Sequence, residues 1–512
     1  MLPHTIVDAL ETNSRWRAHE PAIICDDQTV DWREFNAAAN QLANALIDRG
    51  VSSGARVAVL TENRPEHLIA IFGALKAGAA AVPLSPYLTG DILAGLMADA
   101  AVSALVADDS LMEPAKGAVA QLPHGETVQK ICIGAPEAGW THWDAFLSEN
   151  AAQPAVEIAP DSEAVVIYSS GTTGTPKGIV HTHASRREFA MGLGLVLGLR
   201  PHSHGLVTTP LCSNGSWMIF APCIACGVPV TITKGFSPES FFDAVETNGC
   251  TVTFAVPTQS KMILEADDFS RCDFSRFDTL VSSGAALPRA LKQALSKNLP
   301  GRLIELYGQT EGVATILYPG EVEAHIDTVG RPGAGTDIVI LTDDGQVAGA
   351  GEIGEIAGWV PSQMTGYLNR PVETREVWWH DAAGRRYIRT GDIGRITKDG
   401  YLQIMDRKKD MIVSGGFNIF PQDIEAIIRG HPDVRDVAVI GVPDDRWGET
   451  PVAIIIANDA QAGSSDELMD WINARVAKTQ RVSRVVLRET DFPRNLIGKV
   501  LKRSLRDEYA AG

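Results

Sequence analysis

The sequence is poor in cysteine, poor in basic residues and free of long apolar runs. Seven cysteines among 512 residues are too few for a disulfide scaffold. Lys and Arg total 45 against 63 Asp and Glu, a formal net charge of −18. This balance disfavours general binding of nucleic acid, whose affinity comes from cations that neutralise phosphates. Any anionic substrate must therefore find a locally basic site.

Targeting and membrane-spanning segments are not evident either. The most apolar stretch, residues 191–199, is much shorter than the ~20 residues that span a bilayer. The first residues, MLPHTIVDALE, lack the basic start and apolar core of a secretory signal. We therefore expect a cytoplasmic enzyme without a membrane span.

The composition and the length of the chain are typical of a globular protein. Hydrophobic residues make up 45% and charged residues 21% of the chain, which excludes wholesale disorder. At roughly 150 residues per domain the length corresponds to about three domain equivalents. Cys223 and Cys226 have C-x-x-C spacing, which is compatible with redox or metal chemistry. No second pair completes a zinc site, so buried thiols that act as small hydrophobic groups are favoured.

The pattern of apolar residues predicts an α/β fold with two domains. Strand-like runs alternate with helical stretches before residue 330, which favours parallel-type sheets covered by helices. Strands are expected at residues 56–60, 80–84, 102–107, 164–167, 206–209, 229–233 and 251–255, and helices at 66–79 and 89–98. Residues 330–405 read as a β-barrel-like part of a large N-terminal domain, 1–405. A small, mobile α+β domain is predicted for 406–512, with a helix at 465–477 and strands at 434–442 and 454–457.

A loop rich in glycine and hydroxyl groups follows the expected strand at 164–167. Glycines let backbone N–H groups approach an anion, hydroxyls add donors and a lysine adds positive charge. The loop does not match a Walker A motif, yet its composition suits a polyphosphate. The residues that would bind it are Ser169, Ser170, Gly171, Thr172, Thr173, Gly174 and Lys177.

This loop resembles the phosphate-loop signature of the adenylate-forming superfamily, which includes acyl- and aryl-CoA synthetases, luciferases and peptide-synthetase adenylation domains. Further signatures of that superfamily follow in the expected order, so the resemblance spans nearly the whole chain. They are the segments 307–312 (YGQTEG), 389–392 (RTGD), 406–421 (DRKKDMIVSGGFNIFP) and 493–499 (PRNLIGK).

The resemblance implies an ATP-dependent carboxylic acid–CoA ligase. The acid would attack the α-phosphorus of ATP to give an acyl-adenylate and pyrophosphate, and the thiol of CoA would then displace AMP. Because charge builds up between two anions, the first step needs cations and oriented donors. ATP, Mg²⁺ and CoA are therefore expected to bind.

The resemblance also assigns residues to the nucleotide. Glu311, with Thr310 beside it, would hold Mg²⁺, Asp392 would accept bonds from the ribose hydroxyls, and Arg407 would reach the ribose or phosphate. Taken singly, these residues could equally form a helix start, a turn and a solvated surface charge. Tyr307 would pack against adenine, and the remaining residues assigned to ATP or AMP are Gly284, Ala285, Ala286 and Gly308.

Lys499 is the residue that the resemblance places over the α-phosphate, carried there by the small domain. One ammonium group at that point would stabilise the transition state. The alternative is that Lys499 belongs to a basic helical face with Lys502, Arg503 and Arg506. By the same resemblance Lys409 is the hinge of the small domain. Gly415 and Gly416 would line the pantetheine tunnel.

The expected acyl pocket comprises Cys212, Ser213, Ser216, Trp217 and Gly308. Many acyl- and aryl-CoA synthetases carry a histidine near positions 212–213, which this chain lacks. Ser213 takes the place of the aspartate that binds the ammonium of amino acids in other relatives, so amino acids are disfavoured. Trp217 either shortens the pocket or faces the core. The first reading favours an aromatic or short-to-medium-chain acid.

Binding of the CoA nucleotide is assigned to Trp447 and Arg481, which can stack and pair with charge. Three alternatives stay open: an acyl-AMP ligase that loads a carrier-protein thiol in trans, a catalytically silent nucleotide-binding protein, and a luciferase-like oxygenase without a dedicated motif. A homodimer is possible. No nucleic-acid partner is expected.

Overall fold

The computed structural model describes residues 5–169, 176–414, 417–444, 446–458, 464–494 and 500–511. The predicted site residues outside these ranges are Ser170, Gly171, Thr172, Thr173, Gly174, Gly415, Gly416 and Lys499. Internal contacts divide the chain into two compact units. Unit 1 comprises residues 1–326, 332–337 and 359–388, and unit 2 comprises residues 327–331, 338–358 and 389–512.

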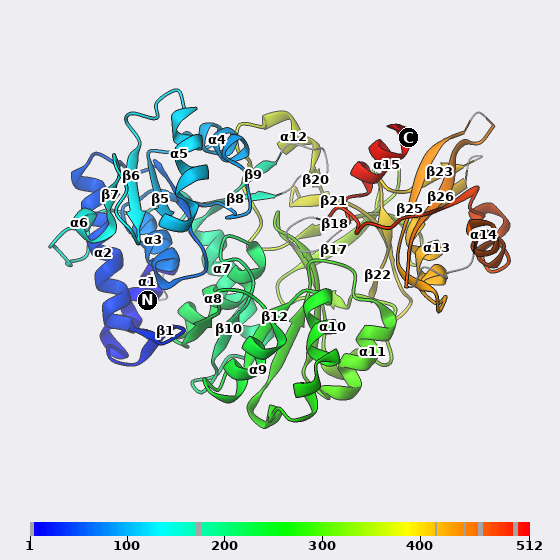
Figure 1. Ribbon diagram of the computed structural model, residues 1–512, viewed down its shortest axis with the longest axis horizontal. Coiled ribbons are helices and arrows are strands. Elements are labelled where there is room, and N and C mark those ends of the chain that lie inside the picture. The colour runs from blue at the N-terminus through cyan, green and yellow to red at the C-terminus, as the bar shows by residue number, and fades with distance from the viewer. Residues whose placement is uncertain are drawn as a thin grey trace. The chain divides into compact units, whose positions relative to one another are not determined.

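Unit 1 contains a sheet that we call the β3 sheet (Figure 1). Its strands are parallel except that β9 pairs antiparallel with both β8 and β19. Their order is β19 (Gly366–Tyr367), β9 (Lys177–Thr182), β8 (Glu163–Ser169), β4 (Ala80–Pro83), β3 (Arg56–Leu60), β5 (Ala104–Asp108), β6 (Gln129–Ile133) and β7 (Thr141–His142).

The second sheet of unit 1, the β13 sheet, is also mostly parallel. Antiparallel pairs join β1 to β2 and β14 to β15. The order is β16 (Arg331–Pro332), β15 (Val313–Leu317), β14 (Leu303–Gln309), β13 (Thr279–Ser282), β12 (Val252–Ala255), β10 (Gly205–Val207), β11 (Val230–Ile232), β1 (Pro21–Cys25) and β2 (Gln28–Asp31).

Helices cover these sheets and pack on one another, as α7 does on α8 (Figure 1). Helix α3 begins with a proline and its apolar residues point in all directions, so nearly every residue of it is buried. The helices are α1 (Ile6–Trp16), α2 (Trp32–Asp48), α3 (Pro65–Lys76), α4 (Gly90–Asp99), α5 (Met112–Ala120), α6 (Trp143–Phe146), α7 (His183–Leu197), α8 (Asn214–Cys226), α9 (Pro238–Glu246), α10 (Pro257–Glu265), α11 (Arg289–Asn298) and α12 (Pro371–Glu376).

The β-rich segment forms a sheet whose central strand is β21. Strand β21 pairs antiparallel with β20 and with β22. The strands are β17 (Asp337–Leu341), β18 (Gly354–Trp359), β20 (Trp378–His380), β21 (Arg386–Ile396) and β22 (Leu402–Arg407).

The C-terminal part of unit 2 has its own sheet with a hydrophobic cluster on each face. Side chains of β25 alternate between them, because successive residues of a strand point to opposite faces. Val437 and Val439 pack with α13 and α14, whereas Ala438 and Ile440 pack with Leu505 of α15. The elements are β23 (Ile412–Ser414), β24 (Phe417–Ile419), α13 (Pro421–Ile428), β25 (Val434–Asp444), β26 (Gly448–Ala457), α14 (Ser465–Asn473), β27 (Arg484–Leu487) and α15 (Lys502–Ala511).

The predicted fold class, a large α/β part with a small α+β part, is confirmed. The expected strand at 56–60 has the observed bounds. The strand expected at 454–457 begins earlier, at Gly448, because its polar first half pairs with β25 in a hairpin.

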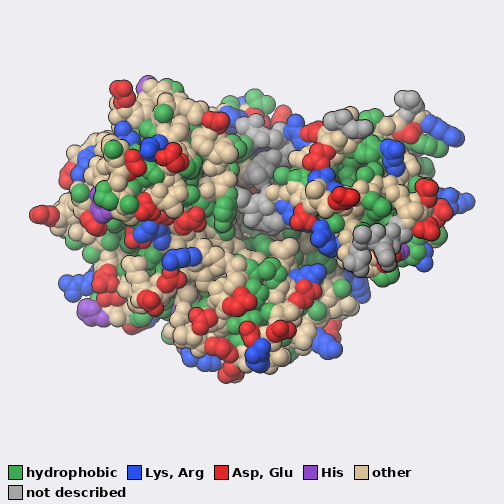
Figure 2. All heavy atoms as spheres, viewed as in Figure 1, with side chains coloured by type: hydrophobic (Ala, Val, Ile, Leu, Met, Phe, Trp, Pro, Cys, Tyr) green, Lys and Arg blue, Asp and Glu red, His purple; other side chains and the backbone are tan. Residues whose placement is uncertain are grey.

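No helix in the described ranges is both long and apolar enough to cross a membrane. Acidic and basic side chains are interspersed over the face shown in Figure 2.

Candidate functional site

The predicted pocket residues of unit 1 gather at one edge of the β13 sheet. Strands β10, β12, β13 and β14 run parallel, so their carboxyl ends meet at the same edge. Residues 283–286 follow β13, residues 208–213 follow β10, and Tyr307 and Gly308 lie near the end of β14. In open α/β sheets, ligands bind outside the carboxyl ends of strands. The fold thus brings three separate sequence segments to one edge.

Thr310 and Glu311 form the turn between β14 and β15, and two glycines permit its shape. A Cβ at Gly308 would lie 2.4 Å from the carbonyl oxygen of Val313, and one at Gly312 would lie 2.4 Å from Cα of Gln363. Gly312 also has a φ of +114°, which side chains rarely allow. The Glu311 carbonyl accepts a hydrogen bond of 2.8 Å from the N–H of Met364. The turn therefore holds Glu311 in a fixed, half-buried position.

Tyr367 connects Glu311 to Lys177. The Tyr367 hydroxyl donates a hydrogen bond to Oε1 of Glu311 at 2.9 Å, and the Lys177 ammonium lies 4.9 Å from the Tyr367 ring centroid. Burial, together with the charge of Glu311, raises the pKa of Tyr367, so the phenol stays protonated and donates. Strand β19 pairs with β9 and fixes Tyr367 opposite Ile179. No sequence motif marks Tyr367, which lies outside the recognised signatures.

The residues predicted to form the phosphate loop lie between β8 and β9 in the sequence. These strands form an antiparallel hairpin in which Ser169 is opposite Lys177. Ser169 and Lys177 are both half-buried. The hairpin therefore brings the two described ends of the loop together, with a hydroxyl on one strand and an ammonium group on the other. Residues 170–175 between them are not described.

His181, on β9, lies fully inside unit 1 near the Glu311 turn. Burial lowers the pKa of its imidazole well below the usual value, and the charge of Arg186 lowers it further. Backbone groups of Thr310 and Ser362 oppose this shift only in part. The imidazole is therefore neutral at physiological pH.

The residues predicted for the acyl pocket form the start of α8. Ser213 is the N-cap of that helix, and its hydroxyl accepts a bond from the N–H of Ser216. The Ser216 hydroxyl is buried and bonds to Thr209 and the Pro210 carbonyl. Burial raises the pKa of the Cys212 thiol to about 12, so it stays protonated. Ser213 and Ser216 therefore shape the helix start, and the Cys212 thiol lies buried just before it.

Trp217 is fully buried in α8. Its ring lies 4.7 Å from that of Phe220, and the Arg186 guanidinium lies 5.0 Å from the Trp217 ring. The Arg186 Nη1 atom donates a hydrogen bond of 3.0 Å to Oδ1 of Asn214. Sequence reasoning did not find Arg186, because the adjacent pair Arg186-Arg187 looks like a solvated stretch of a helix.

The other residues of unit 1 that the sequence analysis singled out lie in a turn after β13 and in helix α8. Gly284 has a φ of +87° in the exposed turn after β13, which favours glycine there. Ala285 and Ala286 complete that turn. The thiols of Cys223 and Cys226 are free, and burial raises the pKa of each. This agrees with their interpretation as small hydrophobic groups.

In unit 2, Asp392 and Arg407 form an ion pair. They are direct partners across β21 and β22, and Nε of Arg407 lies 3.0 Å from Oδ1 of Asp392. Asp392 is buried, and its N–H donates to the Thr390 hydroxyl at 3.0 Å. The pair therefore presents a fixed carboxylate beside a cation, although the two residues lie 15 positions apart in the sequence.

The segment with the predicted hinge follows this pair. Burial raises the pKa of Asp406 to about 6, and its carboxylate accepts bonds from the N–H groups of Arg407 and Gln422. Burial lowers the pKa of Lys409, and the nearby charge of Arg407 lowers it further. Asp410 pairs with Arg506 of α15.

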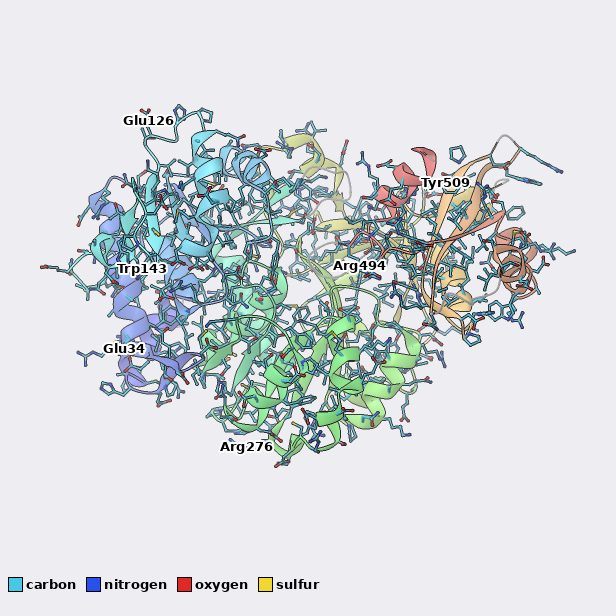
Figure 3. All side chains as sticks on the ribbon, viewed as in Figure 1. Glu34, Glu126, Trp143, Arg276, Arg494 and Tyr509 are labelled. Atoms are coloured by element: carbon cyan, nitrogen blue, oxygen red, sulfur yellow. The ribbon has the colours of Figure 1, made fainter. Side chains whose placement is uncertain are left out.

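The residues predicted for CoA lie on the surface of unit 2. Trp447 is 47% exposed, and the Arg446 guanidinium lies 4.6 Å from its ring. Arg481 is exposed too. Near Lys499 the structure describes the flanking residues: Arg494 and Val500 form an antiparallel bridge, and Arg494 (labelled in Figure 3) pairs with Asp436.

The described residues contain no cluster of three His, Cys, Asp or Glu side chains that could enclose a metal ion. Mg²⁺, however, commonly binds to one or two carboxylates and completes its coordination with water and phosphate oxygens. Glu311 fits that pattern, because its bond to Tyr367 uses one of its two oxygen atoms. It could hold Mg²⁺ in the presence of a bound nucleotide.

Comparison with known proteins gives matches over nearly the whole chain. The family model "AMP-binding enzyme" matches residues 10–368, and "AMP-binding enzyme C-terminal domain" matches residues 423–499. The chain is 33% identical to the long-chain-fatty-acid–CoA ligase FadD13 of Mycobacterium tuberculosis, with 95% of this chain and 94% of the relative covered. It is 31% identical to a feruloyl-CoA synthase of Amycolatopsis sp, with 97% of each chain covered.

A solved structure gives a similar result. The anthranilate CoA ligase AuaEII in complex with anthranoyl-AMP superposes with a TM-score of 0.88 at 26% identity, and the match covers 100% of this chain and 99% of that one.

Proposed function

Because the chain belongs to the AMP-binding enzyme family, in its acyl- and aryl-CoA ligase branch, we propose that it activates a carboxylic acid in two steps. The chain is an AMP-forming acid–CoA ligase. In the first step, a carboxylate oxygen attacks the α-phosphorus of ATP, the bond to pyrophosphate breaks and an acyl-adenylate forms. In the second step, the CoA thiol loses its proton, its sulfur attacks the acyl carbon and AMP leaves.

The observation that carries this proposal is the arrangement of three side chains: Glu311 in the turn after β14, Tyr367 on β19 and Lys177 on β9. It joins a carboxylate, a phenol donor and an ammonium group within one unit. Attack by one anion on another needs positive charge and fixed donors at the phosphates. Lys177, together with Ser169 and the loop residues 170–174, would supply these groups.

Mg²⁺ would be held by Glu311, with Thr310 beside it. A magnesium ion bound there would neutralise part of the charge of the phosphates. Tyr367 fixes the Glu311 carboxylate by its hydrogen bond, so the chain contributes an oriented ligand.

Further residues would bind the nucleoside end of ATP. Asp392 would accept hydrogen bonds from the paired ribose hydroxyls, since an ionised carboxylate is an acceptor at both oxygens. Its ion pair with Arg407 holds the carboxylate in place. Tyr307, Gly308 and residues 284–286 would flank the adenine.

The acid would bind beside α8, against residues 212–217 and Gly308. Trp217 is buried, and beside the bound acid its ring would take up space that a long chain needs. This supports an aromatic or short-to-medium-chain acid as the substrate.

The second step requires the small domain, 406–512, to move relative to the large one. Lys499 would leave the adenylate, Lys409 would act as the hinge, and Gly415 and Gly416 would line the path of the thiol. Trp447 and Arg481 would bind the CoA nucleotide by stacking and charge.

A product assay tests this function. The purified protein is given ATP, Mg²⁺, CoA and a panel of benzoates, cinnamates, short branched acids and fatty acids. We expect acid-dependent AMP, pyrophosphate and one acyl-CoA that mass spectrometry identifies. AMP formation without any acyl-CoA would point to a carrier-protein thiol as the acceptor. No AMP with any acid would contradict the proposal.

Substitution of Tyr367 by phenylalanine removes the hydroxyl that orients Glu311. We expect the rate of pyrophosphate formation at limiting Mg²⁺ to fall about tenfold, as is usual for partners that orient a metal ligand. Raising the Mg²⁺ concentration should restore part of the loss. The measurement is a Mg²⁺ titration of pyrophosphate release.

Tyr387→Phe is the matched control, because its hydroxyl also donates to a carboxylate, that of Asp337, at 2.6 Å. That pair lies on β21 and β17, outside the proposed site. Equal Mg²⁺ dependence in Tyr367→Phe and Tyr387→Phe would contradict the assigned role of Tyr367.

A further inference from the structure

Arg186 is a buried cation to which no salt bridge is assigned in the described part of the chain. It lies on α7 and is 1% exposed. The neighbouring Arg187 is half-buried and pairs with Glu188. None of the described carboxylates forms an ion pair with Arg186. A buried charge that lacks a counter-ion is expensive, so its retention calls for an explanation.

The contacts of Arg186 occupy only part of its guanidinium group. Nη1 donates to Oδ1 of Asn214 at 3.0 Å. The rings of Phe189 and Trp217 each lie 5.0 Å from the guanidinium carbon. Nε and Nη2 are buried and make no hydrogen bond within the described part of the chain.

These two nitrogen atoms form the edge with which arginine binds a carboxylate side-on. The same edge is used elsewhere in this protein. Arg56 donates from Nε and Nη2 to the two oxygens of Glu163 at 3.0 and 3.2 Å. Arg64 binds Glu66 in the same way at 2.8 and 3.2 Å. Such bidentate pairs are stronger than single bonds and are specific for planar anions.

The environment leaves the group charged. Burial lowers the pKa of Arg186 to about 9, so the guanidinium is still protonated at neutral pH. A neutral acceptor would satisfy the hydrogen bonds and leave the charge uncompensated. A carboxylate would satisfy both requirements.

The position of Arg186 identifies what could bring that carboxylate. Asn214 is the first residue of α8 and follows the cap Ser213, and Trp217 lies on the next turn. All three belong to the segment assigned to the acyl pocket. Arg186 also influences His181, whose imidazole is affected by the backbone of Thr310. Arg186 is therefore in contact with the segment assigned to the acid, through Asn214 and Trp217.

We propose that Arg186 binds a second carboxylate of the acid substrate through its Nε and Nη2 edge, so that this ligase selects dicarboxylic acids. The inference rests on the proposed function, since it names the substrate class of the same site. One carboxylate reacts with ATP, and the other pairs with Arg186 beside Asn214. The rings of Trp217 and Phe189 exclude water from that pair and strengthen it.

The test compares matched acids that differ by one carboxylate: pentanoate with pentanedioate, hexanoate with hexanedioate, and benzoate with benzene-1,3-dicarboxylate. For each pair, acid-dependent AMP formation gives a ratio of kcat/KM, diacid over monoacid. We expect the preferred pair to show a ratio well above one in the native protein. Arg186→Met should lower that ratio about 10²-fold, because one partner of a buried charge pair is lost. Arg187→Met, on the same helix, is the matched control and should leave the ratio unaltered.

Thermal unfolding gives a readout that does not depend on turnover. Without ligand, Arg186→Met should unfold at a higher temperature than the native protein, because a buried unpaired charge has been removed. The preferred diacid should raise the Tm of the native protein and leave that of Arg186→Met unchanged. If Arg186→Met does not fold, Arg186→Lys takes its place. Lysine keeps the positive charge but lacks the Nε and Nη2 edge, so Arg186→Lys should lower the diacid-to-monoacid ratio of kcat/KM about tenfold.

The outcomes separate this inference from the proposed function. Turnover of monoacids with no preference for any diacid, or an unchanged ratio in both Arg186 variants, would overturn the role of Arg186 and leave the ligase activity standing. A Tm raised by a diacid in the native protein but not in Arg186→Met, with no AMP from any acid, would support the binding site and contradict the ligase. If no diacid raises the Tm of the native protein and no diacid is preferred over its matched monoacid, the inference is overturned.

Discussion

Replacement of Lys499 by alanine is expected to lower the rate of acyl-adenylate formation by about 10²–10³-fold, the usual effect of removing a donor that stabilises a developing charge. The same variant should convert a pre-made acyl-adenylate and CoA into acyl-CoA at close to the native rate. The reason is that Lys499 is proposed to act only on the α-phosphate in the first step. The measurements are pyrophosphate release for the first half-reaction and thioester formation for the second.

Arg503→Ala is the matched control for Lys499. Arg503 lies on α15, faces Asp507 at 3.9 Å and belongs to the basic face that is the alternative explanation of Lys499. If Lys499 were one more charge on that face, the two alanine variants would behave alike. If Lys499→Ala lowers the rates of both half-reactions equally, the proposal that Lys499 acts only in the first step is contradicted.

Replacement of Glu311 by glutamine should lower kcat/KM of the first step by about 10²–10³-fold. Glutamine can still accept the hydrogen bond from Tyr367 and fits the same turn, so the loss isolates the negative charge. Much more Mg²⁺ should be needed for the remaining activity. A Mg²⁺ titration of pyrophosphate release measures both effects.

A carboxylate remote from the turn provides the control for Glu311. Glu265, at the end of α10, pairs with Lys261 at 3.7 Å and is largely exposed. Glu265→Gln should leave the Mg²⁺ dependence as it is. Native kinetics in Glu311→Gln would exclude Glu311 as the residue that holds the metal ion.

Much of the fold could be predicted from the sequence because its strands are short apolar runs bounded by turn residues. The strand at 56–60 is buried along almost its entire length and is parallel to both neighbours, which produces a continuous Val- and Ala-rich run. The hairpin of β25 and β26 was harder to predict. Its polar half, near Glu449 and Thr450, looks like a loop until it is paired.

The candidate site was predictable only where a motif marks it. Glu311 and Asp392 stand in recognisable signatures, and their roles stay predictions. Tyr367 contributes to the site through a strand, β19, that is two residues long and carries no periodic signal. Arg186 was hidden for a different reason. Burial depends on the packing of α7 on α8, which the sequence around an Arg-Arg pair does not reveal.

The most direct test of the account is isotope exchange between labelled pyrophosphate and ATP. The protein, Mg²⁺, ATP and the best acid of the panel are incubated without CoA. We predict label in ATP that depends on the acid and on Mg²⁺, because the acyl-adenylate forms reversibly before any thiol is needed. Thioester formation accompanied by ADP and phosphate, with no label in ATP for any acid, would contradict an adenylate intermediate.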